Sequence, residues 1–296
     1  MLTECDPSFE IFLADEVSCN KNSRIRKVLA AYENMHMRKV LVYTAIENEY
    51  DFLSPTPYGF NDFHYVCFSN TISKKYKNGW QIIKNPSAEK SAVLKCRDVK
   101  INPHKYLSNY DYSIWVDGSV VFSAEFLNYI LNCIAEKDTI ILVKHRVRSC
   151  VYEEAKACRR SLKESGDIIE RQVNLYLEDG YPEKNGLVET GVMLRKHSDI
   201  SLQSVMDLWW SNVKSHSHRD QLSVNYCLWK KSVDYKLMPG TMSSNNPGFI
   251  VQPHRGKMLA NWYFFLEARV FQGKNLFYPA YVLLGWAKKI KMLIKL

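Results

Sequence analysis

The stretch YDYSIWVDGSVVF, residues 110–122, contains the feature on which the interpretation of this sequence depends. Its isoleucine, tryptophan and valine favour a strand buried in a sheet, but the run ends at Asp117 and Gly118. A lone carboxylate is costly to bury unless a cation or hydrogen-bond donors compensate for it. We therefore expect Asp117 to meet such a partner. The simpler alternative is that Asp117 forms a turn or caps the next helix.

Strands and helices alternate on both sides of this stretch. Apolar runs rich in β-branched and aromatic residues predict further strands at 39–46, 63–69, 80–83, 139–144 and 187–195. Helices are expected at 24–37, 88–100, 124–135, 152–178 (mostly helical), 201–213 and 220–230. This alternation predicts an α/β fold with a mostly parallel central sheet flanked by helices. Ligands of such sheets bind beyond the carboxyl ends of the strands.

Composition narrows the class of protein. The chain has 296 residues with a formal net charge of +9, which favours an anionic partner such as a nucleic acid, a lipid surface or a phosphorylated small molecule. The eight cysteines form no CxxC pair, which indicates reduced thiols and a cytoplasmic protein. We expect no signal peptide at the N-terminus and no transmembrane segment.

The predicted strand ends carry oxygen-rich side chains. Thr44, Glu47 and Asp51 follow the first strand, Asn70 follows the second, and Ser119 follows Asp117. Such oxygens suit Mg²⁺ or Mn²⁺ bound together with a diphosphate. No GxGxxG, GxxxxGK[ST], GxSxG or HExxH motif occurs, so a dinucleotide site and a P-loop are not expected.

Eight short motifs in fixed order then carry a family resemblance. They are YTAIENEYD (43–51), YVCFSN (65–70), GW (79–80), RDVKINPHKYL (97–107), YDYSIWVDGS (110–119), KHRVRSCVYEEA (144–155), ETGVMLRKH (189–197) and HRDQLSVNYCLWK (218–230). Together, over roughly residues 39–240, the chain resembles the glycosyltransferase-like domain family of plant mucilage hexosyltransferases, which has bacterial relatives in polysaccharide gene clusters.

The resemblance implies a GT-A-like fold and transfer of a hexose from a nucleotide-diphosphate sugar to a glycan or lipid-linked saccharide, and we expect the sugar to be UDP-linked. The family's DxD-like metal site falls on Asp117, Gly118 and Ser119, where the second acid is missing. His254 is the expected additional ligand for Mn²⁺ or Mg²⁺. The alternative for this histidine is a surface loop position.

The resemblance also assigns roles to other residues. The expected contacts of the nucleotide-sugar donor are Thr44, Ala45, Glu47, Asp51, Asn70, Arg97, Lys100, His104, Asp117, Gly118, Lys144 and His145. Arg97 and Lys100 share a helix face and would grip phosphate, or would form a solvated basic surface. Glu189, Asp220 and Gln221 are expected to meet the sugars. Asp220 would deprotonate the acceptor or bind its hydroxyls, or would simply cap a helix.

The sequence divides into an N-terminal extension at 1–38, a GT-A-like glycosyltransferase domain at 39–256 and a basic helical tail at 257–296. In the tail, residues 281–296 form an amphipathic pattern. Leu283, Trp286, Ala287, Ile290, Leu293 and Ile294 share one face, whereas Lys288, Lys291 and Lys295 share the other. This pattern predicts peripheral binding to an anionic membrane surface, on the inner face, or packing of the apolar face on the domain.

Two other functions compete with glycosyl transfer. A catalytically silent carbohydrate-binding or scaffold protein would explain the missing second acid at Ser119. A nucleic-acid-binding protein would explain the net charge. However, carboxylates at the strand ends would repel phosphate without a metal, so we expect no nucleic acid partner.

Overall fold

The computed structural model describes residues 40–60, 63–161, 164–254 and 261–293, with side chains described up to residue 286. The chain divides into two units after Lys39, and only the second unit is described. The predicted extension at 1–38 and its helix at 24–37 therefore lie outside the described residues.

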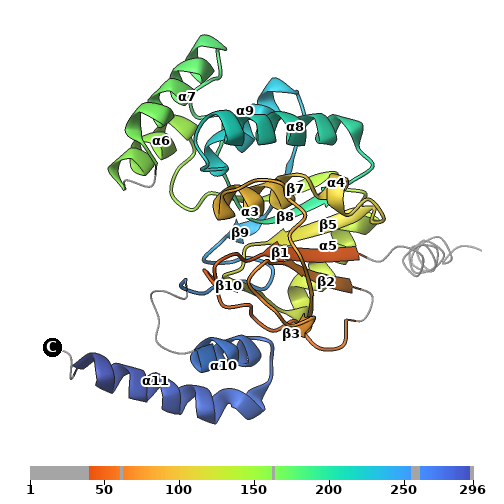
Figure 1. The fold of residues 1–296 in the computed structure, drawn as a ribbon, viewed down its shortest axis with the longest axis vertical. Coiled ribbons are helices and arrows are strands. Elements are labelled where there is room, and N and C mark those ends of the chain that lie inside the picture. Colours follow the sequence, from red (N-terminus) through yellow and green to blue (C-terminus); the bar gives the residue numbers. More distant parts are fainter. Residues whose placement is uncertain (1–39, 61–62, 162–163, 255–260, 294–296) are drawn as a thin grey trace, which may run out of the picture. The chain divides into compact units, whose positions relative to one another are not determined.

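An eight-stranded sheet forms the centre of the described unit (Figure 1). Its strands, in spatial order, are β3 (Tyr76–Lys77), β4 (Trp80–Ile83), β2 (Phe63–Phe68), β1 (Val40–Ala45), β5 (Tyr112–Val116), β8 (Val188–Lys196), β7 (Ile140–Lys144) and β9 (Lys236–Thr241). Four of its seven strand pairings are parallel, and the antiparallel ones are β3 with β4 and β8 with both its neighbours. The predicted α/β class with a mostly parallel sheet is confirmed.

The two faces of the sheet are covered by different helices, because side chains alternate along each strand. In β1, Leu41 and Tyr43 belong to a core shared with helices on one face, and Val40 and Val42 belong to a core on the other. The first core takes up residues of α3 (Ala92–Ile101), α6 (Val151–Arg160), α7 (Gly166–Glu178), α8 (Ile200–Ser215) and α9 (Gln221–Lys230). The second takes up α5 (Ala124–Ala135) and a small sheet of β6 (Val120–Phe122) and β10 (Phe249–Val251).

Several predicted boundaries differ from the structure. Helix α3 begins four residues later than expected, and a short helix, α4 (Pro103–Tyr106), follows it directly. The helical stretch expected at 152–178 is two helices, α6 and α7. Strands β3, β9 and β10 were not expected, because each is short or largely exposed and lacks a continuous apolar run.

The C-terminal part is helical, with α10 (Asn261–Phe271), a short 3₁₀ turn η2 (Asn275–Phe277) and α11 (Tyr278–Leu293). Figure 1 shows α10 and α11 side by side. Within the described residues, none of the helices combines the length and the apolar character needed to cross a membrane.

Candidate functional site

The candidate site lies where β5, β7 and β8 meet at one edge of the sheet. Because β8 runs antiparallel to β5 and β7, its first residues lie beside the carboxyl ends of both neighbours. The backbone N–H of Asp117, just past β5, donates a hydrogen bond to the carbonyl of Gly191 over 2.8 Å. Val143 of β7 pairs with Glu189. The fold therefore brings Glu189, Thr190 and Gly191 beside Asp117.

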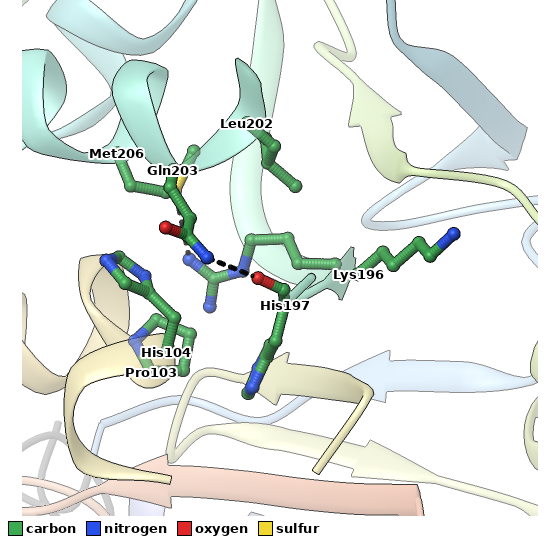
Figure 2. Close-up of a pocket in the computed structure, with 8 residues that line it drawn as sticks. Pro103, His104, Lys196, His197, Leu202, Gln203 and Met206 are labelled. Atoms are coloured by element: carbon green, nitrogen blue, oxygen red, sulfur yellow. Dashed lines mark hydrogen bonds between the residues drawn. The ribbon is translucent and has the colours of Figure 1, made fainter. Parts of the chain in front are cut away.

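His104 lies at the other end of β8 and does not join this edge. It lines a small cavity of about 10 Å³ with Lys196, His197 and Gln203 (Figure 2). A cavity of this size holds about one water molecule. Burial lowers the pKa of His104 to about 4, so its ring is neutral near pH 7. Helix α4 carries His104 to the far end of β8, away from Asp117, and the donor contact expected for it stays a prediction.

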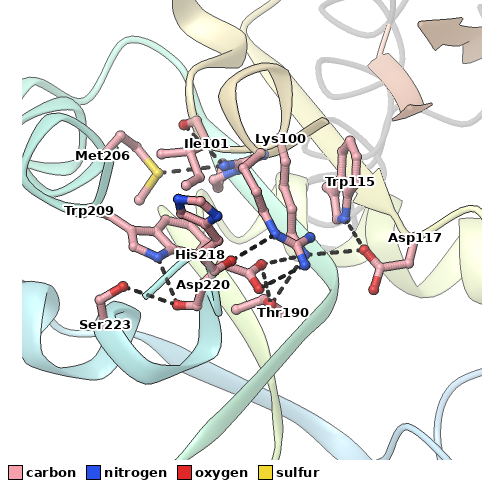
Figure 3. A network of polar contacts seen from close by, with 12 residues as sticks. Lys100, Ile101, Trp115, Asp117, Thr190, Met206, Trp209, His218, Asp220 and Ser223 are labelled. Atoms are coloured by element: carbon pink, nitrogen blue, oxygen red, sulfur yellow. Dashed lines mark hydrogen bonds and ion pairs between the residues drawn. The ribbon is translucent and has the colours of Figure 1, made fainter. Parts of the chain in front are cut away.

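Lys100 is the centre of a polar network at the site (Figure 3). Its ammonium lies 3.1 Å from Oδ1 of Asp117, 3.2 Å from the Thr190 hydroxyl and 2.7 Å from Oδ2 of Asp220. Its side chain is only 1% exposed. An ammonium has three N–H donors, and here three acceptors surround it, so the buried charge is fully compensated.

Asp220 is a buried and strongly paired carboxylate. Besides Lys100, it has Nη2 of Arg97 at 3.4 Å, and Thr190 donates a hydrogen bond to it over 2.9 Å. Burial alone would raise the pKa of Asp220, but the charges of Arg97 and Lys100 outweigh it and hold this pKa well below its usual range. The side chain makes no capping bond to α9, so the capping alternative is wrong. A carboxylate so acidic and so occupied suits charge balance better than proton transfer.

Two buried residues hold the end of α3 that carries Lys100. The Tyr43 hydroxyl donates to the carbonyl of Lys100 over 3.0 Å, and Nη1 of Arg195 donates to the carbonyl of Ile101 over 3.4 Å. Tyr43 and Arg195 also contact each other. A cation at the C-terminal end of a helix is favoured by the helix dipole. Strands β1 and β8 thus fix the position of the Lys100 ammonium.

Asp117 is the exposed member of the network. Lys100 and the indole N–H of Trp115, at 2.7 Å, both contact its Oδ1, and the side chain is 39% exposed. A β-carbon at Gly191 would lie 3.3 Å from Oδ2 of Asp117 and 2.7 Å from Cε of Met242. A side chain at position 191 would therefore displace the end of Met242 and crowd the Asp117 carboxylate.

The glycine after Asp117 leaves room for a second carboxylate, that of Asp51. A β-carbon at Gly118 would lie 3.0 Å from Oδ2 of Asp51 and 2.9 Å from Cγ1 of Ile46. Asp51 in turn is paired with Nδ1 of His254 over 2.7 Å. Burial raises the pKa of Asp51, and the His254 contact opposes this shift. The segments around Asp51 and His254, distant in sequence, thus meet beside Asp117.

The expected metal ligands are not assembled as a set. Ser119 is buried, and its carbonyl accepts a hydrogen bond from the N–H of Gln252. His254 faces Asp51, and Lys100 occupies one oxygen of Asp117. No group of three or more histidine, cysteine, aspartate or glutamate side chains in the described part of the chain is placed to hold a metal ion. A cation held by Asp117, Ser119 and His254 stays a prediction.

A second charged cluster surrounds His145. Its Nδ1 accepts hydrogen bonds from the backbone N–H groups of Val147 and Arg148, at 3.1 and 2.8 Å, so a ring proton resides on Nε2. This Nε2 lies 3.8 Å from Oε1 of Glu189 and 3.7 Å from Oε2 of Glu154. Burial lowers the pKa of His145, so the ring is neutral near pH 7.

Glu189 is a carboxylate of the site that has fewer charged partners than Asp220. Its Oε2 is buried and has no hydrogen-bond partner among the described residues. Burial raises the pKa of Glu189, although the backbone N–H groups of Arg146 and Met242 lower it. A carboxylate with a raised pKa and an unused oxygen can accept a proton.

The remaining expected donor contacts are less available. Thr44 and Ala45 are buried within β1. Glu47 is buried and accepts hydrogen bonds from the backbone and side-chain nitrogens of Asn70, at 3.2 and 3.0 Å. These contacts join β1 to β2 and leave little of Glu47 for a ligand. Lys144 is exposed at the end of β7.

Gln221 is the first residue of α9 and is half-buried. It follows Asp220 directly, and the sugar contact expected for it stays a prediction.

Comparison with known proteins places this site in a family. The family described as TOD1/MUCI70, glycosyltransferase-like domain, matches residues 69–244. A protein of Arabidopsis thaliana named as a probable hexosyltransferase, MUCI70, is 28% identical over 133 residues, which are 42% of this chain and 23% of the plant protein. The matched region is thus less than a quarter of that relative.

Two solved structures are also similar. A WbbM bifunctional glycosyltransferase in its apo form is 11% identical with a TM-score of 0.40, over 68% of this chain and 39% of the other. Mouse xyloside xylosyltransferase 1 in its apo form is 8% identical with a TM-score of 0.38, over 68% of this chain and 85% of the other.

The family match covers Lys100, Asp117, Glu189 and Asp220, whereas Asp51 and His254 fall outside it. It spans more than half of the chain and contains both charged clusters of the site. The chain therefore belongs to the TOD1/MUCI70 glycosyltransferase-like domain family.

Proposed function

We propose that this protein is a glycosyltransferase that moves a hexose from a nucleotide-diphosphate sugar, UDP-linked, to a hydroxyl group of a glycan or a lipid-linked saccharide. The observation that carries this proposal is the pairing of two charged clusters at one sheet edge, both within the family match at 69–244. One cluster offers fixed cations and an exposed carboxylate, and the other offers a carboxylate with a raised pKa.

The donor diphosphate would lie against Arg97, and it would meet the Asp117 carboxylate only through a divalent cation. The Arg97 guanidinium is 22% exposed and is held by Asp220, so it can contact a phosphate without losing its place. Lys100 is buried, so the alternative that it forms a solvated basic helix face does not hold. Its charge would add to the positive potential at the diphosphate. Asp51 and His254 would border the nucleotide side of the same pocket.

A divalent cation is a separate proposal. Asp117 would contact a Mn²⁺ or Mg²⁺ ion that arrives with the diphosphate, because part of its carboxylate is exposed. His254 and Ser119 are the other ligands to test. Such an ion, when bound, supplies positive charge that stabilises the departing nucleotide.

The acceptor would lie on the other side of the sugar, near Glu189. Transfer with inversion needs a base that removes the proton of the acceptor hydroxyl. Glu189 suits this role better than Asp220, because its pKa is raised and its side chain is 21% exposed, whereas that of Asp220 is only 6% exposed. The backbone N–H groups of Arg146 and Met242 would hold its orientation.

The test is a thermal-shift panel of UDP-, GDP- and ADP-sugars, with and without Mn²⁺. A ligand at 100 times its Kd stabilises a protein by about 2.7 kcal/mol, which gives a clear shift. We expect a shift with UDP-sugars for the wild type and for the control Asp207→Asn, whose carboxylate is exposed on α8. Asp117→Asn should reduce the shift. No shift with any nucleotide sugar, in a folded protein, would contradict the donor site.

The silent carbohydrate-binding alternative is supported by the serine at position 119, where the second acid of the DxD-like motif is missing. Release of UDP from a UDP-sugar, measured with and without saccharide acceptors, separates the two functions. Binding without any release under either condition would favour the scaffold protein.

A further inference from the structure

The C-terminal helices carry the densest group of exposed large apolar side chains in the described part of the chain. These residues are Trp262, Leu276, Tyr278, Leu283 and Trp286. No tryptophan elsewhere in the described ranges is classed as exposed. Exposed apolar groups gathered in this way mark an interaction surface more often than chance exposure does.

Helix α10 attaches this part of the chain to the domain. Phe264 is buried and stacks on Phe52, with the ring centroids 6.0 Å apart. Arg269 and Gln272 donate hydrogen bonds to the backbone carbonyls of residues 55–56, at 3.0 and 2.7 Å. The exposed side chains therefore belong to a helix pair that is anchored on the domain.

Helix α11 packs on α10 with the face that carries Tyr281 and Gly285. Tyr281 lies against Tyr263, with ring centroids 5.2 Å apart, and a β-carbon at Gly285 would lie 3.9 Å from the same ring. Leu283 and Trp286 lie on another face and are 71% and 67% exposed. In the part that the structure describes, the alternative that this stripe packs on the domain is therefore wrong.

The charge of the same segment indicates what covers this face. The sequence contains no acidic residue after Glu267, whereas Lys274, Lys288, Lys289, Lys291 and Lys295 follow; Arg269 is buried against the domain and is not counted with them. An uncompensated run of basic residues favours an anionic partner. Tryptophan is enriched where an apolar interior meets water and charged headgroups. A basic helix with an exposed tryptophan and leucine on one face has the composition of an interfacial membrane helix.

We propose that the C-terminal hairpin, residues 261–293, docks the protein onto the surface of a bilayer that contains anionic phospholipids. Leu283 and Trp286 enter the headgroup region, and the basic residues meet the lipid phosphates. The proposal does not depend on the transfer reaction. If both hold, docking would bring the sugar site close to lipid-linked acceptors.

The test is co-sedimentation of the full chain with vesicles of phosphatidylcholine alone or mixed with phosphatidylglycerol. We expect binding to the mixed vesicles, with each basic residue near the surface raising partitioning about fivefold. The double variant Leu283→Ser/Trp286→Ser should bind at least about tenfold more weakly. The control Val147→Ser/Ile200→Ser removes two similarly exposed apolar side chains from other elements and should bind like the wild type.

Thermal unfolding of each variant shows whether the fold is intact, and exposed substitutions of this kind should change it little. Wild-type protein that ignores the anionic vesicles, or a Leu283/Trp286 variant that binds as well as the wild type, overturns the proposal. Light scattering tests whether the chain instead forms a dimer through this surface. A dimer that this same double variant dissociates, without vesicle binding by the wild type, would assign the surface to a second copy of the chain.

Discussion

Two clusters of charged residues, one around Lys100 and one around Glu189, lie at the same edge of the sheet but are compensated in opposite ways. Lys100 has three acceptors within 3.2 Å, and Asp220 is paired with two cations and a hydroxyl. Glu189 has a neutral histidine at 3.8 Å and an oxygen without a partner among the described residues. Burial acts on both carboxylates, yet the pKa of Asp220 is lowered and that of Glu189 is raised.

This difference separates two tasks, holding charged groups in place and accepting a proton, which sequence alone does not assign to different residues. The ion network fixes the positions of Asp117 and Arg97, and it holds the buried Asp220 carboxylate ionised between two cations. In the cluster around His145, no cation neutralises Glu189 at hydrogen-bond distance, and its pKa is raised. A carboxylate with a raised pKa is what acid–base chemistry requires. We therefore expect substitutions in the first cluster to affect stability most, and those in the second to affect the reaction.

The largest effect is expected from Lys100→Met. The substitution removes the main counter-charge of Asp220, which stays buried with only Arg97 as a cationic partner. Breaking a buried ion pair on one side costs about 3–5 kcal/mol, because an uncompensated charge remains. Urea unfolding at pH 7 measures this loss.

The matched control is Lys105→Met, which removes an ion pair of 2.6 Å with Asp207 on the surface. Exposed pairs contribute about 0–1 kcal/mol, so this variant should unfold nearly like the wild type. Equal losses in the two lysine variants would mean that the Lys100 network is not a special source of stability.

Glu189→Gln should reduce the reaction rather than the fold. The amide keeps the shape of the side chain but cannot take up a proton, so kcat for sugar transfer or hydrolysis should fall at least about 10²-fold. Folding stability should change by less than about 1 kcal/mol, and the thermal shift with UDP-sugar should persist.

Glu153→Gln provides the comparison for this variant, since Glu153 is an exposed carboxylate in the first turn of α6. It should leave kcat unchanged. A Glu189→Gln variant with wild-type kcat would remove Glu189 from the proton transfer and would return the question to Asp220.

Much of the fold could be predicted, because strongly apolar runs such as those of β1 and β5 specify buried strands locally. The charged residues that follow them, including Asp117 and Glu189, could be named from their positions after or within such runs. The orientation of β8 could not be predicted, because periodicity does not distinguish a parallel from an antiparallel strand. That orientation is what brings Glu189 beside Asp117.

The supporting residues of the site were missed for a related reason. Tyr43 and Arg195 hold the end of α3 across 57 and 94 positions of sequence, and nothing local in either strand indicates this contact. Thr190 was noted only as part of a motif, although it contacts both Lys100 and Asp220. The distance of His104 from Asp117 could not be predicted, because the turn into α4 cannot be read from the spacing of basic residues.

An intermediate effect is expected from Gly118→Ala. The new methyl group would lie 3.0 Å from Asp51 and 2.9 Å from Ile46, so one of them must shift. Overpacking of this kind costs about 1–3 kcal/mol. Gly166→Ala is the control, because the nearest atom to its β-carbon is 3.6 Å away and the site begins a helix. It should be neutral or slightly stabilising in the same unfolding measurement. Equal stability of the two alanine variants would show that Asp51 tolerates displacement.

The smallest effect is a difference in how stability depends on pH. Asp220 has a lowered pKa in the folded state, so its stabilisation is present above the unfolded pKa of about 3.9 and is lost as the pH falls below it. Glu189 has a raised pKa, so the sign is reversed. Its ionisation opposes folding, and this contribution grows as the pH rises from about 4.3 through the raised folded value. The free energy of unfolding of Glu189→Gln, relative to wild type, should therefore increase over that interval. A difference that stays constant with pH would show that Glu189 titrates alike in the folded and unfolded chains, and the contrast between the two clusters would then rest on Asp220 alone.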